Sequence, residues 1–169
     1  MTNNVYIHIP FCRQKCNYCS FVSYNTLEYK EDYLKALSGE IKDFYKSEKL
    51  KTLYFGGGTP SLVSCREIQD IVNLFNIDSN TEVTMELNPE TLDEEYLQNL
   101  LNIGINRISI GCQAFDKDLL KIIGRKHSAE NVVNAVTAAQ KAGFKNISLD
   151  FIYGLPNQTV KGFENDLKK

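Results

Sequence analysis

The sequence predicts an α/β fold with a parallel sheet, either barrel-like or doubly wound, on two observations. First, five short strand-type runs at 5–9, 52–55, 82–87, 107–110 and 147–152 alternate with segments of helical apolar spacing. Second, the polar and glycine-rich segments follow the strands, and the carboxyl ends of parallel strands meet at one edge of a sheet. Runs such as Thr-Leu-Tyr-Phe at 52–55 fit strands that are covered on both faces.

Each segment between the strands carries a helical pattern. Ser64 with Glu67, and Thr91 with Glu94, are spaced as capping boxes at the start of a helix. Ser128 begins a further helix, and glycines end two of the helices. The closing glycines are Gly104 and Gly143, and Thr159 caps the last helix. The five helices carry the apolar stripes Tyr29, Tyr33, Leu37, Ile41 and Phe44; Ile68, Ile71, Val72 and Phe75; Leu97, Leu100 and Leu101; Val132, Val133, Val136 and Ala139; and Phe163 and Leu167.

Composition bounds the class of protein. The 169 residues suffice for one domain, and a net charge of −2 gives no electrostatic support for a nucleic-acid partner. No apolar run reaches the roughly 18 residues of a membrane helix, and the polar residues 1–4 lack the pattern of a signal peptide. We therefore expect a cytoplasmic protein, with membrane contact only through a partner. In that compartment clustered cysteines more often indicate metal binding or catalysis than disulfides.

Three cysteines, Cys12, Cys16 and Cys19, lie in one short segment after the first strand. Thiolates are the usual ligands of iron–sulfur clusters, and three of them leave one iron of a four-iron cluster open to a substrate or cofactor. A closed structural zinc site would need a fourth ligand close by. The spacing favours a cluster over buried thiols, whereas the isolated Cys65 and Cys112 are expected to be ordinary packed thiols.

The other strands end in residues that suit ligand binding. The segment 56–60, Gly-Gly-Gly-Thr-Pro, is either a tight turn or a backbone that approaches a ligand closely, and it lacks the lysine of a phosphate loop. Glu86 and Asp150 end strands that are otherwise apolar, so each carboxylate needs a hydrogen-bond partner or a polar ligand. The remaining polar side chains are weaker candidates: Gln113 and Arg125 for a ligand, His8 as a satisfied interior residue and His127 as a surface residue.

Six ordered motifs span essentially the whole chain. They are Tyr6-Ile7-His8-Ile9-Pro10-Phe11-Cys12 with Cys16, Tyr18 and Cys19; Gly56-Gly57-Gly58-Thr59-Pro60; Glu86-Leu87-Asn88-Pro89; Ile108-Ser109-Ile110-Gly111-Cys112-Gln113; Arg125-Lys126-His127; and Asp150-Phe151-Ile152-Tyr153-Gly154-Leu155-Pro156. Together they resemble the radical S-adenosylmethionine (radical SAM) enzymes. More narrowly, they resemble the oxygen-independent coproporphyrinogen III oxidase family and its heme-chaperone branch.

The resemblance implies a role for each matching position. Cys12, Cys16 and Cys19 would bind a [4Fe–4S] cluster, and S-adenosylmethionine (SAM) would bind the open iron through its amino and carboxylate groups. The positions that match SAM contacts of the oxidase are Tyr6, Tyr18, Gly57, Gly58, Thr59, Glu86, Gln113, Arg125 and Asp150. No residue is assigned a catalytic role.

The resemblance also implies the extent of the domain. The family has a barrel of about six βα units and a C-terminal domain. Residues 1–169 would then form the N-terminal part of a radical SAM core, a partial TIM-like barrel of five βα units, with the end of the barrel and the C-terminal domain lying beyond residue 169.

Phe21 bears on the choice between branches. The oxidase carries a further cysteine two residues after the third ligand, where this chain has Phe21, and the segment 154–159 also resembles the heme-chaperone branch. The resemblance therefore implies a heme chaperone whose full-length form binds heme. Its partners would be a one-electron reductant of the flavodoxin or ferredoxin type and a heme-acceptor protein.

Two alternatives remain open. One is an oxidase that decarboxylates two propionates of coproporphyrinogen III. The other, from a different class, is a non-catalytic iron–sulfur electron carrier, which would leave the glycine triplet, Glu86 and Asp150 unexplained.

Overall fold

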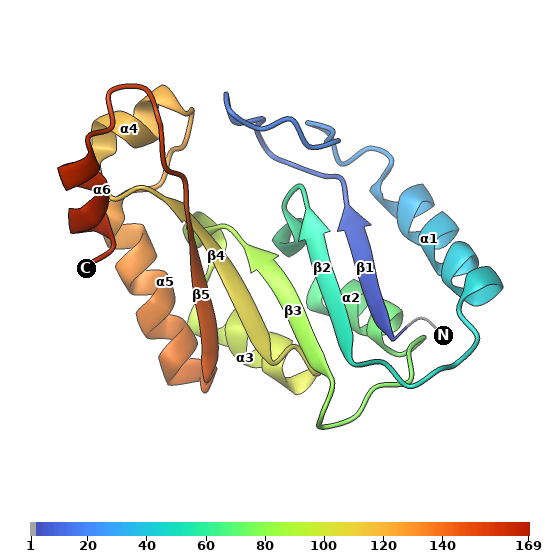
Figure 1. Cartoon of the computed structure of the whole chain (residues 1–169). Helices are drawn as coiled ribbons and strands as arrows, with labels where there is room; N and C mark the ends of the chain where they lie inside the picture. Colours follow the sequence, from blue (N-terminus) through green and yellow to red (C-terminus); the bar gives the residue numbers. More distant parts are fainter. Residues whose placement is uncertain (1–2) are drawn as a thin grey trace.

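The computed structural model describes residues 3–169, with only the backbone of Thr91, so Met1 and Thr2 of the polar leader lie outside the described residues. Five parallel strands form one sheet in the order β1-β2-β3-β4-β5 (Figure 1). The strands are β1 (Asn4–Ile9), β2 (Thr52–Gly57), β3 (Glu82–Leu87), β4 (Arg107–Gln113) and β5 (Asn146–Phe151). All five predicted strands are confirmed, and β1 and β5 form the edges of an open sheet.

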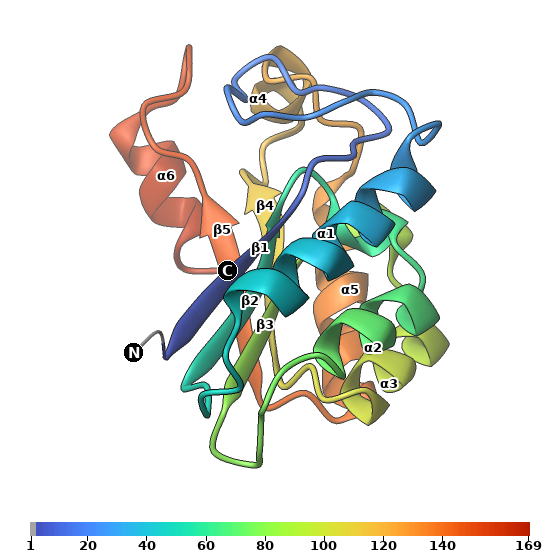
Figure 2. The same ribbon diagram turned by 90° about the vertical axis from the view of Figure 1, so that its right-hand side faces the viewer.

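Helices follow the strands in turn and confirm the five predicted βα units. They are α1 (Lys30–Phe44), α2 (Cys65–Val72), α3 (Glu94–Asn102), α4 (Lys117–Ile122), α5 (Ala129–Ala142) and α6 (Val160–Asp166), with short 3-10 turns η1 (Pro60–Leu62) and η2 (Pro89–Thr91). Figure 2 shows α1, α2, α3 and α5 on one face of the sheet. Helices gathered on one face form the wall of a barrel, so the chain folds as a partial barrel and not as a doubly wound sheet.

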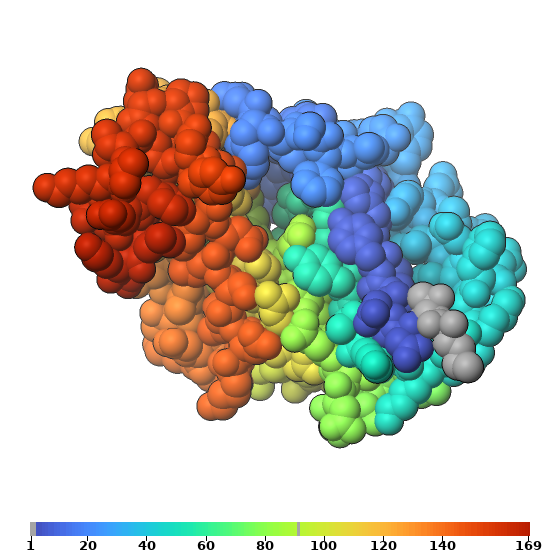
Figure 3. Space-filling model, viewed as in Figure 1, coloured from blue at the N-terminus to red at the C-terminus, as the bar shows by residue number. Residues whose placement is uncertain are grey.

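The two faces of the sheet differ in chemistry. Residues that face the helices are apolar and buried, such as Leu53 and Phe55 of β2. On the other face Arg107 donates hydrogen bonds to Thr84 Oγ1 (3.3 Å) and Ser148 Oγ (2.9 Å), which links β3, β4 and β5. The expectation that both faces are covered is therefore wrong for the described residues. Figure 3 shows this open face, where the green and yellow atoms of the central strands lie between the N-terminal and C-terminal parts of the chain.

Local capping explains where several helices begin and end. The Ser64 hydroxyl accepts the Glu67 N–H at 3.3 Å, and the Glu67 carboxylate accepts the Ser64 N–H at 2.8 Å, so the predicted capping box is confirmed. Ser128 caps α5 as predicted, and Gly143 ends it with φ at 108°. A left-handed residue after the last turn is a common helix end, and glycine adopts it without strain.

One expectation about the helices is wrong, and one helix was not expected. Thr91 does not cap α3, because it belongs to η2 and the helix begins later, after Asp93, whose carboxylate accepts the Tyr96 N–H at 2.7 Å. Helix α4 was not predicted at all, because six residues are too short to show a helical period. Its sequence signals are the cap Asp116 and the closing Gly124, which has φ at 75°.

Two apolar clusters hold these elements together. The main core lies between the sheet and its helices and includes the fully buried Ile9, Leu97 and Ile108. A smaller cluster of Leu120, Leu155 and their neighbours joins α4 to the segment after β5. This smaller core fixes α4 beyond the carboxyl end of the sheet (Figure 1).

None of the described helices combines the length and the apolar character needed to cross a membrane.

Candidate functional site

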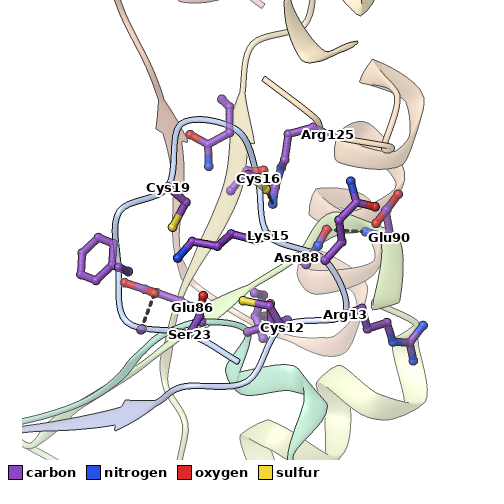
Figure 4. A pocket seen from close by; sticks show the side chains of 18 of the residues that line it. Cys12, Arg13, Lys15, Cys16, Cys19, Ser23, Glu86, Asn88, Glu90 and Arg125 are labelled. Carbon is purple, nitrogen blue, oxygen red and sulfur yellow. Dashed lines mark hydrogen bonds between the residues drawn. The ribbon is translucent and has the colours of Figure 1, made fainter. Parts of the chain in front are cut away.

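A cavity of about 540 Å³ lies at the carboxyl end of the sheet (Figure 4). Its walls come from residues 12–23, which we call the cysteine loop, and from the carboxyl-terminal parts of the other strands with the segments that follow them. Eleven of the twelve predicted site residues line it: Cys12, Cys16, Tyr18, Cys19, Gly57, Gly58, Thr59, Glu86, Gln113, Arg125 and Asp150. Residues from five different βα units therefore meet at one place, as the positions of the motifs after the strands predicted.

Tyr6, the twelfth residue, does not line the cavity. It lies on the open face of β1, where its ring stacks on Tyr54 with ring centroids 5.8 Å apart. Its hydroxyl is 3.4 Å from His8 Nδ1, and His8 Nε2 is 2.9 Å from the carbonyl of Val22. His8 is hydrogen-bonded as expected, but it lies half-buried on the open face and not in the interior.

The base of the cysteine loop is closed by the backbone. Phe11 is buried, packs edge-on against Tyr33 of α1 with ring centroids 5.5 Å apart, and forms a β-bridge with Tyr24. The Cys12 N–H donates to the Tyr24 carbonyl (3.0 Å), and the Tyr24 N–H donates to the Pro10 carbonyl (2.7 Å). The backbone of Cys12 is therefore held in a fixed position beside the sheet.

Two of the three glycines at the end of β2, Gly57 and Gly58, allow this loop to lie close to the strand. A Cβ at Gly58 would lie 2.6 Å from the Phe11 oxygen and 3.0 Å from Cys12 Sγ. Gly57 has φ at 113°, and a Cβ there would lie 2.6 Å from the His8 ring. The glycines are thus required by the approach of two chain segments, which a tight turn alone would not demand.

Two of the three cysteine sulfurs accept hydrogen bonds. Thr59 Oγ1 donates to Cys12 Sγ (3.7 Å), and Arg125 Nη1 donates to Cys16 Sγ (3.8 Å), while Cys19 lies farther along the same loop (Figure 4). Within the described residues, no three His, Cys, Asp or Glu side chains are close enough together to hold a single metal ion. A four-iron cluster is bound through separate irons, so its ligands need not meet at one point, and hydrogen bonds to sulfur tune such clusters.

The cavity wall also contains buried polar atoms that need a partner. Arg125 Nε and Ser23 Oγ are buried and have no hydrogen-bond partner among the described residues. Because an unpaired buried polar atom costs free energy, both favour a polar ligand in the cavity. The charged side chains of the wall have both signs: Arg13, Lys15, Arg125 and Lys126, against Glu86, Glu90 and Asp150. Three thiols with such a wall fit an iron–sulfur cluster and a zwitterionic ligand.

Both candidate carboxylates have partners in the protein. Tyr54 Oη donates to Glu86 Oε1 (2.9 Å), and the Gly57 N–H donates to Glu86 Oε2 (3.1 Å). Ser109 Oγ donates to Asp150 Oδ1 (2.7 Å). A carboxylate oxygen accepts more than one hydrogen bond, so each group is held in place and can still bind a ligand in the cavity.

A β-bulge at the end of β4 positions Arg125. Arg125 Nη2 donates to the Gly111 carbonyl (2.7 Å), and His127 Nε2 donates to the Cys112 carbonyl (3.0 Å). His127 is only 4% exposed, so the expectation that it lies at the surface is wrong. Burial and the nearby positive charge of Arg125 lower the pKa of His127 to about 4, so its imidazole is neutral at pH 7.

The remaining cysteines lie outside the cavity. Cys112 is fully buried, and burial raises the pKa of its thiol to about 12. Cys65 contacts the Tyr96 carbonyl, and burial raises the pKa of its thiol as well.

Tyr18 lines the cavity, and burial raises the pKa of its hydroxyl to about 12, although the nearby Arg125 acts in the opposite direction. The Tyr18 side chain therefore stays uncharged at neutral pH.

The sequence prediction did not include several residues of the cavity wall. For three of them the sequence held a sign of a role at the site: Arg13 and Lys15 lie between the cysteines, and Asn88 lies two residues after Glu86 in the third motif. Others have none, since nothing in the sequence shows that Ser23 is buried at the wall or that Tyr54 holds Glu86.

Comparison with known proteins decides the family. Residues 6–169 match the family model of the Radical SAM superfamily. The chain belongs to the radical SAM superfamily. This superfamily implies a [4Fe–4S] cluster and SAM, in agreement with the thiols and the mixed charges of the cavity.

Comparison with curated proteins shows which members of the superfamily this chain resembles. It is 39% identical over 172 residues to the heme chaperone HemW of Lactococcus lactis, covering 99% of this chain and 45% of the relative. It is 39% identical over 173 residues to the heme chaperone HemW of Bacillus subtilis, covering 97% and 46%. It is 35% identical over 179 residues to the oxygen-independent coproporphyrinogen III oxidase of Helicobacter pylori, covering 99% and 39%.

A solved structure has the same fold. The coproporphyrinogen III oxidase HemN of Escherichia coli, a radical SAM enzyme, matches with a TM-score of 0.87 and 31% identity, over 96% of this chain and 40% of that one. The chain thus spans less than half the length of the relatives it matches.

Proposed function

We propose that this radical SAM chain forms the cluster- and SAM-binding part of a heme chaperone, in which Cys12, Cys16 and Cys19 bind a [4Fe–4S] cluster. The observation that carries the proposal is the single cavity that the three cysteines share with residues at the carboxyl ends of the four other strands. A bound cluster supplies one-electron reduction of the SAM sulfonium. An electron carrier that used only the cysteine loop would have no need for the other walls.

The remaining predicted residues bind and orient SAM. Gly57 and Gly58 offer backbone groups where no side chain can intervene. The carboxylates of Glu86 and Asp150, held by their own partners, accept hydrogen bonds from an ammonium or from ribose hydroxyls. Arg125, whose Nε lacks a partner among the described residues, donates to an acceptor in the cavity. Tyr18, Thr59 and Gln113 complete the list of proposed SAM-binding residues that line the cavity. Tyr6 is the one predicted position outside the cavity wall, where its ring stacks on Tyr54.

Phe21 favours the chaperone over the oxidase. It lines the cavity and is 60% exposed, at the position where the oxidase resemblance calls for a further cysteine. A phenylalanine cannot replace the redox or proton chemistry of a thiol. The relatives at 39% identity that are named heme chaperones support the same choice.

The oxidase is the second candidate. It is favoured by the 35% identity to an oxygen-independent coproporphyrinogen III oxidase and by the TM-score of 0.87 with HemN. In either case the porphyrin or heme is bound by the complete protein. A one-electron reductant of the flavodoxin or ferredoxin type and, for the chaperone, a heme-acceptor protein complete the proposed set of partners.

One experiment separates the two candidates. The complete protein is reconstituted with iron and sulfide without oxygen, reduced, and supplied with SAM. Heme is then titrated and followed by its absorbance, while coproporphyrinogen III is incubated with the same preparation and analysed by chromatography. The chaperone should bind heme at one site and leave coproporphyrinogen III unchanged. Formation of protoporphyrinogen over many turnovers would instead establish the oxidase, and absence of both activities would contradict both candidates.

A further inference from the structure

The cysteine loop has a second attachment on the far side of the cavity from β1. Asn17 donates its side-chain Nδ2–H to the Ile122 carbonyl (2.9 Å) and its backbone N–H to the Ile123 carbonyl (3.0 Å). Gln14 Nε2 of the same loop donates to the Gly124 carbonyl (3.3 Å). These bonds join segments that are more than 100 residues apart in the chain.

The three accepting carbonyls lie at the end of α4. A helix leaves its last carbonyls without partners inside the helix, and they must be satisfied from elsewhere. Asn17 and Gln14 therefore cap α4 from outside. Asn17 packs closely against the end of α4, because a Cβ at Gly124 would lie only 3.2 Å from Asn17 Cγ. Gly124 also has φ at 75°, a conformation that favours glycine.

The attachment lies between two of the proposed cluster ligands. Cys16 precedes Asn17, and Cys19 is linked to Cys16 by a backbone hydrogen bond of 3.1 Å. Arg125, which follows α4, donates to Cys16 Sγ at 3.8 Å. The loop is thus closed at its base by Phe11 and Tyr24 and held at its tip by the end of α4.

We propose that Asn17 is a positioning residue that fixes the tip of the cysteine loop on α4 before any cluster binds, so that Cys16 and Cys19 are held at the cavity in the metal-free protein. The proposal rests on the cysteines' role in the proposed function. The side chain of Asn17 is exposed, so its replacement removes a local hydrogen bond without opening the core.

The test compares three variants of the complete protein. Asn17→Ala removes the amide, Asn17→Asp keeps its shape but places an acceptor opposite the Ile122 carbonyl, and Asn17→Gln retains a donor. Asn134→Ala, on the exposed side of α5, is the matched control. In the metal-free protein, hydrogen exchange of residues 12–20 should be roughly fivefold faster for the Ala and Asp variants, the effect of one lost hydrogen bond. Exchange of β2 and β4 should not change, and Asn17→Gln should restore part of the protection.

A second readout uses the reconstituted protein. A chelator should remove iron roughly fivefold faster from Asn17→Ala than from the wild type or from the Asn134→Ala control. Unchanged exchange in the cysteine loop, or faster exchange spread equally over all strands, would overturn the positioning role. If wild-type protein binds iron without needing its three cysteines, the proposed function fails, whereas the exchange experiment still decides whether Asn17 holds the loop.

Discussion

Tyr54 Oη donates a hydrogen bond of 2.9 Å to Glu86 Oε1, and this contact joins the polar open face of the sheet to the cavity at its carboxyl end. The other oxygen of Glu86 accepts the Gly57 N–H at 3.1 Å. Burial and the negative charge of Glu86 raise the pKa of Tyr54, so its hydroxyl remains protonated and able to donate at neutral pH. Two donors from β2 thus orient a carboxylate on β3.

Tyr54→Phe should therefore weaken the binding of SAM. Glu86 would lose one of the two donors that orient it, and the loss of one hydrogen bond predicts binding weaker by roughly fivefold. Equilibrium dialysis of SAM against the reconstituted protein measures the change. Tyr29→Phe, at an exposed tyrosine that precedes α1, is the matched control. An equal loss in the control, or none in Tyr54→Phe, would contradict the role of Tyr54.

The proposed cluster ligands predict a sharp division among the five cysteines. Replacement of Cys12, Cys16 or Cys19 by Ala should abolish the loading of about four irons per chain, because each thiolate binds one iron of the cluster. Cys65→Ala and Cys112→Ala should leave iron content unchanged, because neither residue lines the cavity. Iron and sulfide analysis after anaerobic reconstitution measures this. A requirement for Cys65 or Cys112 equal to that of the three would refute the three-ligand site.

Substitution by alanine is expected to have opposite effects on stability at Gly58 and at Gly39. Gly58→Ala should destabilise the protein by roughly 1–3 kcal/mol, since its Cβ would overlap the Phe11 backbone and contact Cys12 Sγ. Gly39→Ala should stabilise the protein by roughly 0.5–1 kcal/mol, because Gly39 lies inside α1 with nothing within 4 Å of the new Cβ.

Chemical denaturation of the metal-free protein, followed by circular dichroism, measures both changes. Gly58→Ala should also lower the iron content after reconstitution, whereas Gly39→Ala should not. Equal stability of the two variants would show that the close approach of residues 57–58 to the cysteine loop does not contribute to the stability of the protein.

The sequence predicted the sheet and the position of the site because both depend on repeated local signals. Strand runs, capping residues such as Ser64 and Ser128, and the glycines all act within a few residues of the chain. The grouping of the motifs at one edge followed from the geometry of parallel strands. The family resemblance then assigned roles that composition and spacing alone do not contain.

Apart from the cap of α3 and the short helix α4, the errors concern contacts between distant segments. His127 precedes a helix start in the sequence and was expected at the surface, yet the bulge of β4 exposes the Cys112 carbonyl to it and buries its ring. The open face of the sheet was expected to be covered, because parallel sheets usually are covered on both faces and runs such as 52–55 fit that arrangement. The attachment of Asn17 to α4 joins positions over 100 residues apart, and no local pattern encodes it.

The buried His127 predicts a specific dependence of stability on pH. Its pKa is about 4 in the folded protein, below its ordinary value of 6.5, because burial and the positive charge of Arg125 disfavour the imidazolium. Between these two values the unfolded chain binds a proton that the folded protein does not. The contribution of His127 is therefore fully present above about pH 6.5 and is lost as the pH falls toward about 4.

His127→Gln should reduce this loss, because the glutamine amide can still donate to the Cys112 carbonyl but does not titrate. The free energy of unfolding of the metal-free protein is measured by denaturant titration at several values between pH 7 and about pH 4.5. The variant should be less stable than the wild type at pH 7, and the difference should narrow as the pH falls, since only the wild type must keep an uncharged histidine buried beside Arg125. Two parallel curves would show that His127 is not the group that titrates.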